Sequence, residues 1–336
     1  MNKKVVLFCL AASVASIASA ACCIGGCSFR HEGKRPLKIA LNIWTGYSHV
    51  FIAQEKGFFK KNKVDVEFFF TKEYSKAQEL YVNGEVDGVF EVFPDTIMHN
   101  ARGIFDKVVY ITDISYDADV IIGKPGLRSL ADLKGKRIGI DGINTFSHLF
   151  VLKSLELCAG LKESDVFFEN VPGQDAVSFL ESGAIDAAHT WDPAKTEALK
   201  KGYKVLARAG DVKGIITDVL CFSAAVVESR PREIEAVVKS LLEARDFLYT
   251  KRQEGVKIIA RAENMTEYDI ENALSGIKQP DLEENIRLMS GAKDAGTLYR
   301  IGENIISFYA NMGQISEVPV LEQILEPKFL KNIKGK

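Results

Sequence analysis

Two tryptophans stand at comparable places in this chain. Trp44 and Trp191 are the only residues of that type, and each follows a strand-like run and enters a loop. A tryptophan in that position either packs in the core or contacts a ligand, and the loop context leads us to expect ligand contact for both. Tyr47 and Phe146 are predicted to form opposing walls nearby. Aromatic walls suit a planar or a cationic ligand group, through stacking or cation–π attraction.

Polar residues occur where two predicted helices begin. Ser48 and Ser147 occupy these helix starts, where N-capping alone is a sufficient reason for a serine. A functional reading is also open, in which Thr145, Ser147 and the unpaired helix N–H groups cradle an anionic or carbonyl oxygen. Asn144 belongs to the same loop. The two readings are compatible.

Acidic residues accompany these aromatic and polar side chains. Asp95 and Asp192 follow strand patterns and begin helices, so a helix-start acid is the alternative explanation for both. Asp218, with Asp119 behind it, is predicted to point into a cleft and hold a ligand N–H or ammonium group. Acids combined with aromatics favour a ligand with a nitrogen donor, and taurine-like zwitterions and pyrimidine precursors fit better than plain nitrate. The complete predicted ligand-binding set is Trp44, Tyr47, Ser48, Asp95, Asn144, Thr145, Phe146, Ser147, Trp191, Asp192 and Asp218.

Strand-like runs alternate with helical patterns through the first part of the chain. The alternation predicts parallel α/β layers. After about Pro231 the pattern becomes mainly helical, beginning with Glu233–Tyr249. The first expected elements are strands at Lys38–Ile43, Val64–Phe70 and Val86–Phe90, and helices at Ser48–Lys56 and Ser75–Asn83.

A shift of 99 residues aligns two segments of the sequence. The matches are Lys38-Ile39 with Arg137-Ile138, Tyr47–Phe51 with Phe146–Phe150, Gly84 with Gly183, Asp87 with Asp186 and Pro94 with Pro193, with one residue of slippage at Asp65-Val66 and Asp165-Val166. Chance similarity between βαβ units is the alternative, but the near-constant register favours two related lobes. Equivalent loops at the carboxyl ends of strands would then face each other across one cleft, where open α/β sheets bind ligands.

Several short motifs also follow one another in a characteristic order. They are Trp44–Tyr47, Ala53–Phe59, Val64–Glu67, Ser129–Gly139, Leu180–Pro193, and Asp218–Leu220 leading into Ser229–Pro231. Together they resemble the type II periplasmic-binding-protein family that serves nitrate, sulfonate, taurine and thiamine-precursor importers. The resemblance covers about residues 37–248.

This resemblance implies a two-lobed α/β fold with two crossing hinge strands and a helical C-terminal tail. The crossings are expected near Ala118–Gly123 and Asp218–Ser223. Lobe one would comprise residues 36–120 plus 221–336, and lobe two residues 121–220. Such lobes close around a ligand by hinge motion. A permease that recognises the closed form couples transport to occupancy through differential affinity for the two states.

The N-terminus predicts export. Lys3 and Lys4 precede an apolar stretch that ends in small residues, as in a secretory signal. Ile24–Cys27 resembles a bacterial lipobox, so residues 1–27 are expected to hold the signal and a lipidated Cys27. Lipidation at Cys22, cleavage after Ala20 and an uncleaved anchor are the alternatives. All of them place the body outside the cytoplasm.

Charge and composition narrow the function. The chain has 43 basic and 45 acidic residues, which gives no strong basic field to hold nucleic acid. Cys158 and Cys221 are too few for a disulfide framework, and we expect both to be buried. His49 and His148 are expected to be solvated or packed, and neither receives a metal role. We therefore predict no metal site and no cofactor.

The expected protein is a monomeric solute-binding lipoprotein, held at the membrane by its lipid in the periplasm or at the cell surface. Its partners would be a small-molecule ligand and the permease and ATPase of an ABC importer. Two alternative functions remain. The first is a ligand sensor that docks on a separate receptor. The second is a pyrimidine or naphthoate synthase on the same fold, with His189 and Asp192 as its candidate catalytic residues. The sequence has no Gly-rich phosphate loop, no His-Glu-x-x-His and no Gly-x-Ser-x-Gly, so no enzyme is predicted.

Overall fold

The computed structural model describes residues 35–291, 294 and 296–335. The predicted lipidation site Cys27, its alternative Cys22 and the cleavage position after Ala20 lie outside the described residues. The chain from Pro36 onward forms a compact unit of its own. Over the described ranges, no helix has both the length and the apolar character needed to cross a bilayer.

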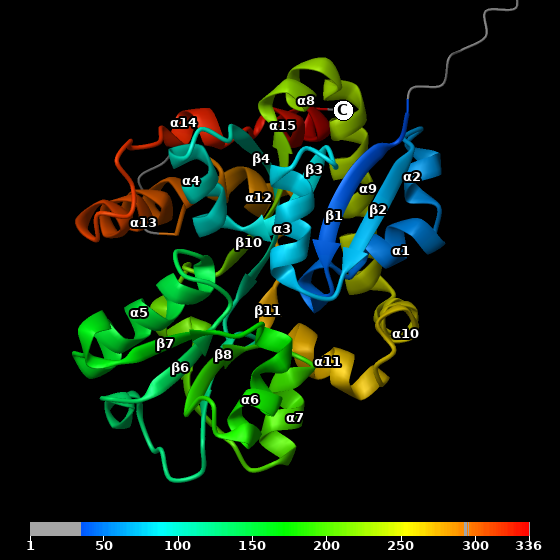
Figure 1. The fold of residues 1–336 in the computed structure, drawn as a ribbon. Coiled ribbons are helices and arrows are strands. Elements are labelled where there is room, and N and C mark those ends of the chain that lie inside the picture. The colour runs from blue at the N-terminus through cyan, green and yellow to red at the C-terminus, as the bar shows by residue number, and fades with distance from the viewer. Residues whose placement is uncertain (1–34, 292–293, 295, 336) are drawn as a thin grey trace, which may run out of the picture. The chain divides into compact units, whose positions relative to one another are not determined.

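The chain forms two β-sheets and a series of mostly short helices (Figure 1). The strands are β1 Leu37–Asn42, β2 Val66–Thr71, β3 Gly88–Val92, β4 Asp106–Ser115, β5 Val120–Gly123, β6 Arg137–Ile140, β7 Phe167–Asn170, β8 Ala187–Thr190, β9 Lys204–Arg208, β10 Thr217–Ser223 and β11 Ile277–Lys278. The α-helices are α1 His49–Glu55, α2 Phe58–Lys61, α3 Tyr74–Val82, α4 Phe93–Ala101, α5 Phe146–Ala159, α6 Ala176–Ser182, α7 Ala194–Lys200, α8 Ala224–Ser229, α9 Pro231–Thr250, α10 Arg252–Glu263, α11 Glu267–Ser275, α12 Leu282–Leu288, α13 Leu298–Asn311, α14 Leu321–Ile324 and α15 Lys328–Lys334. The 3-10 helices are η1 Thr45–Tyr47, η2 Leu130–Leu133, η3 Glu163–Asp165, η4 Gly173–Asp175 and η5 Ala209–Val212.

Both sheets are built on one strand plan. The first has the order β11-β4-β10-β3-β1-β2, and the second has the order β7-β6-β8-β5-β9. Read from the opposite edge, the second sheet matches the first, strand for strand, apart from the added edge strand β11. In each sheet three neighbouring strands run parallel, and the next two pairings are antiparallel. The predicted duplication is therefore present as a repeated topology.

The strand registers repeat with the offset seen in the sequence. Ile39 pairs with Gly88 between β1 and β3. Ile138 pairs with Ala187 between β6 and β8, so both members of the second pair lie 99 positions further along the chain. Chance similarity would not reproduce a pairing register, because register depends on which side chains face the core. The structure confirms two related units.

The repeated aspartates have a structural task at the start of each central strand. Asp87 Oδ2 accepts the N–H of Lys38 at 2.9 Å. Asp186 Oδ2 accepts the N–H of Arg137 at 3.0 Å in the equivalent place. Each carboxylate thus pairs with a backbone N–H near the start of a strand, which explains why both repeats carry an aspartate at this position.

The chain passes between the sheets twice. It leaves the first sheet after β4, enters the second at β5, and returns from β9 to β10 (Figure 1). The connections are residues 116–119 and 209–216. All of β10 lies in the first sheet, between β4 and β3, so the predicted division after residue 220 falls inside one strand. The boundaries given from sequence for the two lobes stay predictions.

The region after Pro231 is mainly helical, as predicted, and packs on the first sheet's side of the chain. Helix α9 contacts α1, α2 and α15. The sequence did not predict β11, a two-residue strand that pairs with the end of β4. Cys221 is buried as expected, whereas Cys158 is exposed near the end of α5, so that part of the prediction is wrong. Helix α5 is buried over its first turns, but its residues from Glu156 to Cys158 are exposed to solvent.

Gly88 is expected to be required for the contact between β3 and β10. A Cβ at this position would lie 2.6 Å from the Phe222 ring and 2.7 Å from the backbone oxygen of Cys221. Gly88→Ala should therefore lower the free energy of unfolding by about 1–3 kcal/mol, because a strand must move aside. Urea unfolding measures this change. Gly291→Ala is the control, since a Cβ there would meet no atom of the described residues within 4 Å; equal stabilities for the two variants would contradict the prediction.

Candidate functional site

A small cavity lies between the two sheets, at the ends of several strands. Its volume is about 20 Å³. The lining residues are Asn42, Trp44, Tyr47, Tyr74, Val92 and Asp218 from the first sheet with its loops and helices, Phe146 and Trp191 from the second, and Asp119 and Ile216 from the two connections. Two loops that the sequence repeat makes equivalent, Trp44–Ser48 and Asn144–Ser147, therefore contribute to one cavity.

Aromatic rings form much of the cavity wall. The ring of Phe146 lies 4.9 Å from Tyr74 and 6.1 Å from Trp191, measured between centroids. Tyr47 packs instead on Phe90 at 5.0 Å. The predicted pair Tyr47 and Phe146 does line the same cavity, but the ring that packs on Phe146 from the first sheet's side is Tyr74.

Two carboxylates of the first sheet stand behind the aromatic wall. Trp44 Nε1–H donates to Asp113 Oδ2 at 3.2 Å, and the Tyr47 hydroxyl donates to Asp218 Oδ1 at 2.5 Å. The second oxygens, Asp113 Oδ1 and Asp218 Oδ2, are buried without a hydrogen-bond partner in the described chain. Burial raises the pKa of Asp113 to about 8. Burial, and then the charge of Asp113, also raise the pKa of Asp218.

A third carboxylate approaches from the other side of the cavity. His189 Nε2 lies 3.1 Å from Asp119 Oδ1, and His189 Nδ1 lies 2.8 Å from Ser147 Oγ. Ser147 Oγ accepts the N–H of Asp141, so its own hydrogen is free to point at Nδ1. This arrangement leaves Nε2–H to donate to Asp119. Asp119 Oδ2 and the Trp191 Nε1–H remain buried and unpartnered among the described residues.

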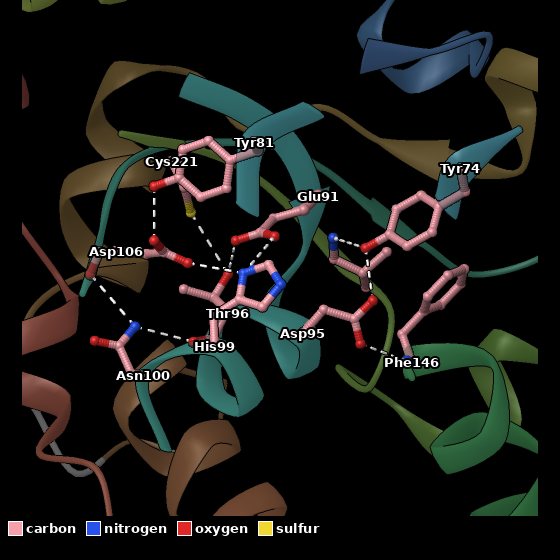
Figure 2. A network of polar contacts seen from close by, with 11 residues as sticks. Tyr74, Tyr81, Glu91, Asp95, Thr96, His99, Asn100, Asp106, Phe146 and Cys221 are labelled. Atoms are coloured by element: carbon pink, nitrogen blue, oxygen red, sulfur yellow. Dashed lines mark hydrogen bonds and ion pairs between the residues drawn. The ribbon is translucent and has the colours of Figure 1, made fainter. Parts of the chain in front are cut away.

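Asp95 connects the two halves of the site directly. Its Oδ1 accepts the N–H of Phe146 at 2.7 Å, and its Oδ2 accepts the Tyr74 hydroxyl at 2.7 Å (Figure 2). Asp95 lies in the first turn of α4 and Phe146 begins α5, so the contact runs from a helix of the first sheet to a helix of the second. One of the helix N–H groups predicted to cradle a ligand oxygen at the start of α5, that of Phe146, is therefore already occupied by a carboxylate of this chain.

Six predicted site residues are absent from the lining of the small cavity: Ser48, Asp95, Asn144, Thr145, Ser147 and Asp192. Ser48 and Thr145 donate to carbonyl oxygens of their own turns. Asn144 N–H faces His148 Nδ1 at 3.3 Å. Asp192 Oδ1 accepts the N–H of Thr196, and its Oδ2 pairs with Lys195 at 3.2 Å. These side chains stabilise the loops and helix starts that carry the cavity wall.

A larger cavity of about 290 Å³ lies beside the first one. It is bounded by α3, α4 and the loop before α5, and its lining includes Tyr74, Asp95, His99, Asn144 and Thr145. Tyr74 lines both cavities and separates them. Asn144 and Thr145 are thus exposed to the larger space rather than to the small one.

Sequence reasoning missed Asn42, Tyr74 and Asp113, and it placed Asp119 only in the background. Asn42 and Asp113 stand near the ends of strands, and that signal could have included them with Trp44 and Asp95. Tyr74 gave no such signal, because it begins a helix that follows an edge strand. Its position in the site depends on tertiary packing against Phe146.

Comparison with known proteins identifies the family. Residues 44–254, more than half of the chain, match the NMT1/THI5-like family. The chain belongs to this family. It is 27% identical over 268 residues to a protein of Brucella abortus that is named as a binding protein, covering 78% of this chain and 82% of that one. It is also 24% identical over 215 residues to 4-amino-5-hydroxymethyl-2-methylpyrimidine phosphate synthase of Saccharomyces cerevisiae, covering 59% of this chain and 62% of the yeast one.

Solved structures show the same architecture. The periplasmic aliphatic sulphonate binding protein of Escherichia coli superimposes with a TM-score of 0.67 at 18% identity, covering 86% of this chain and 97% of that one. The predicted two-lobed periplasmic-binding-protein fold is confirmed. At that level of identity the likeness concerns the fold, and the chemistry must be argued from this chain's own side chains.

Asp95 is expected to make stability depend on pH. Burial raises its pKa to about 6, so the folded protein retains a proton that the unfolded chain loses above pH 4. Its contribution to stability therefore falls as pH rises from about 4 to 6 and is constant above that range. Asp95→Asn cannot titrate, so the variant should gain up to about 3 kcal/mol relative to the parent between pH 4 and 7. Urea unfolding of both proteins across this range measures the difference; parallel curves would contradict the prediction.

Proposed function

We propose that this protein captures a small nitrogen-bearing solute between its two sheets and delivers it to an ABC importer. The main support is the cavity between the sheets, which combines aromatic faces with unpaired carboxylate oxygens. Asp119 and Asp218 are the acidic residues of its lining. Each directs one oxygen that lacks a partner in the described structure.

The charge of the lining discriminates between ligand classes. Burial raises the pKa of Asp218, so a cationic ligand group would favour its charged form, whereas a sulfonate or nitrate would oppose its ionisation and would meet no basic residue in the lining. An ammonium or ring-amino group would instead supply the hydrogen-bond donors that Asp119 and Asp218 lack. Aromatic faces add stacking or cation–π attraction for the same groups. We therefore favour an aminopyrimidine-like or amine ligand, and taurine fits only through its ammonium end.

Ligand entry requires the walls to separate. A cavity of about 20 Å³ has room for about one water molecule. The contacts that hold the two halves together include Asp95 with Phe146, and Lys72 with Asp175 at 3.1 Å on the surface. Exposed ion pairs contribute about 0–1 kcal/mol. We expect opening about the connections 116–119 and 209–216, and closure when a ligand joins the carboxylates on both sides.

Export and delivery complete the proposal. The lipobox-like segment supports a lipid anchor at Cys27, which would hold the domain at the outer face of the membrane. A permease and its ATPase are then the partners, and the protein is proposed to act as a monomer without catalysis. The resemblance to a yeast synthase names the alternative. Recovery of a bound ligand unchanged, by mass spectrometry after prolonged incubation, supports binding; a converted product would contradict it.

Removal of a single carboxylate charge tests the ligand class. The full-length protein should show a rise in melting temperature with an aminopyrimidine or a small primary amine, and none with nitrate or methanesulfonate. Asp218→Asn keeps an oxygen for Tyr47 but cannot ionise to pair with a cationic ligand group, and should weaken binding by about 10–100-fold. Trp191→Ala should also weaken it.

Glu169→Gln is the matched control, because it removes one negative charge from an exposed position of β7. Its affinity should equal that of the parent. A melting-temperature rise with nitrate or sulfonate alone, or full affinity in Asp218→Asn, would refute the proposed ligand class.

A further inference from the structure

A second polar cluster lies under α4, separate from the small cavity. Glu91 comes from β3, His99 from α4 and Asp106 from the first position of β4 (Figure 2). Both carboxylates are 0% exposed and His99 is 8% exposed. Strand β10 joins the two strands by pairing with Glu91 on one side and Asp106 on the other, so the cluster stands on a hydrogen-bonded sheet.

The inner atoms of the cluster converge. His99 Nδ1 lies 2.8 Å from Asp106 Oδ2 and 3.3 Å from Glu91 Oε2. One ligand atom from each of the three residues lies within 4.8 Å of the others. Glu91 Oε2 is fully buried and accepts no hydrogen bond from the described residues. It is aimed at the same point as the imidazole nitrogen.

The outer oxygens are held by hydroxyl groups. Tyr81 donates to Asp106 Oδ1 at 2.6 Å, and Thr96 donates to Glu91 Oε1 at 2.7 Å. Each carboxylate therefore has one oxygen fixed from behind and one directed inward. Metal-binding carboxylates are oriented by outer hydrogen bonds of this kind.

The charges of the cluster call for a cation. Two buried carboxyl groups face one imidazole, and when both are ionised they need a positive charge between them. Buried charges are costly unless they are paired or bind a metal. We propose that Glu91 Oε2, His99 Nδ1 and Asp106 Oδ2 form a binding site for a divalent transition-metal ion.

The donor set and the distances suit such an ion. One imidazole nitrogen with carboxylate oxygens favours Zn²⁺ or its first-row neighbours over Mg²⁺ and Ca²⁺, which prefer oxygen alone. Bonds of about 2.0–2.2 Å to zinc place neighbouring ligand atoms roughly 3–3.5 Å apart. The distance of 3.3 Å between His99 Nδ1 and Glu91 Oε2 already lies in this range. The 2.8 Å between His99 Nδ1 and Asp106 Oδ2 must increase by a few tenths of an ångström. Cys221 adds a thiol at the edge of the cluster, 3.5 Å from Thr96 Oγ1.

An ion can reach this site without entering the small cavity. His99 lines the neighbouring cavity of about 290 Å³, which Glu79 and Arg102 also line. The metal site therefore goes beyond the proposed solute binding and does not depend on it. A proton is the competing occupant. Burial opposes an imidazolium at His99, but Glu91 and Asp106 outweigh burial and raise the pKa of His99 to about 9.

Calorimetric titration of the chelator-treated full-length protein with Zn²⁺ tests the site. We expect about one equivalent of zinc, bound more weakly as pH falls, because zinc must displace protons from its ligands. Zinc content after dialysis provides an independent count. His99→Gln and Glu91→Gln should bind at least about 100-fold more weakly, and Tyr81→Phe about tenfold more weakly.

Glu85→Gln is the control for removal of a carboxylate, since Glu85 is exposed in the loop before β3. It should bind zinc like the parent. Unchanged binding by a folded His99→Gln, or no stoichiometric zinc in the parent, would overturn the proposal and leave the proton as the occupant. If the variants do not fold, anomalous diffraction from zinc-soaked crystals of the parent decides: a peak between the three side chains supports the site, and peaks only elsewhere overturn it. Solute binding is measured on the zinc-free protein. A failure to bind zinc therefore leaves the proposed solute binding untouched, and the reverse also holds.

Discussion

Burying a carboxyl oxygen that has no hydrogen-bond partner is costly in protein folding, and the described chain does so three times around one small cavity. Asp113 and Asp218 each use one oxygen to hold an aromatic side chain and leave the other unpaired. Asp119 does the same through His189. The positions of the aromatic side chains and of the carboxyl groups therefore depend on each other. The hydrogen bonds that fix Trp44 and Tyr47 also fix the direction of the oxygens that remain.

Duplication explains how this arrangement is reached from two sides. The same strand plan occurs twice, with pairings that repeat at a constant offset, so equivalent loops end at equivalent places. Yet the two halves contribute different chemistry. The first sheet presents Trp44, Tyr47 and Asp218, whereas the second side presents Phe146, Trp191 and Asp119. Divergence after duplication has turned a symmetric frame into an asymmetric site with an excess of acceptors.

Much of the fold was predictable from the sequence. Strand and helix patterns depend on neighbouring residues, and the 99-residue repeat is found by comparing the chain with itself. The fold and four lining aromatics followed from them. Other features were not predictable, because they depend on partners distant in the chain. The placement of β10 is decided by strands β3 and β4, and the direction of Thr145 and Asp192 by hydrogen bonds that any helix start can make. Glu91, His99 and Asp106 lie on three elements with no spacing known for metal ligands, so only the assembled sheet brings them together.

The hydrogen bond from Phe146 to Asp95 has a consequence for selectivity. The start of α5 has the geometry that attracts anions, yet its N–H group is held by a carboxylate tethered within the same molecule. A tethered group acts at a high effective concentration, in the millimolar range or above for short flexible connections. A free anion must displace it before gaining that donor. Asp95 therefore competes with any free anion for the Phe146 N–H. An anion can displace it only at high concentration or when other groups of the protein also bind that anion.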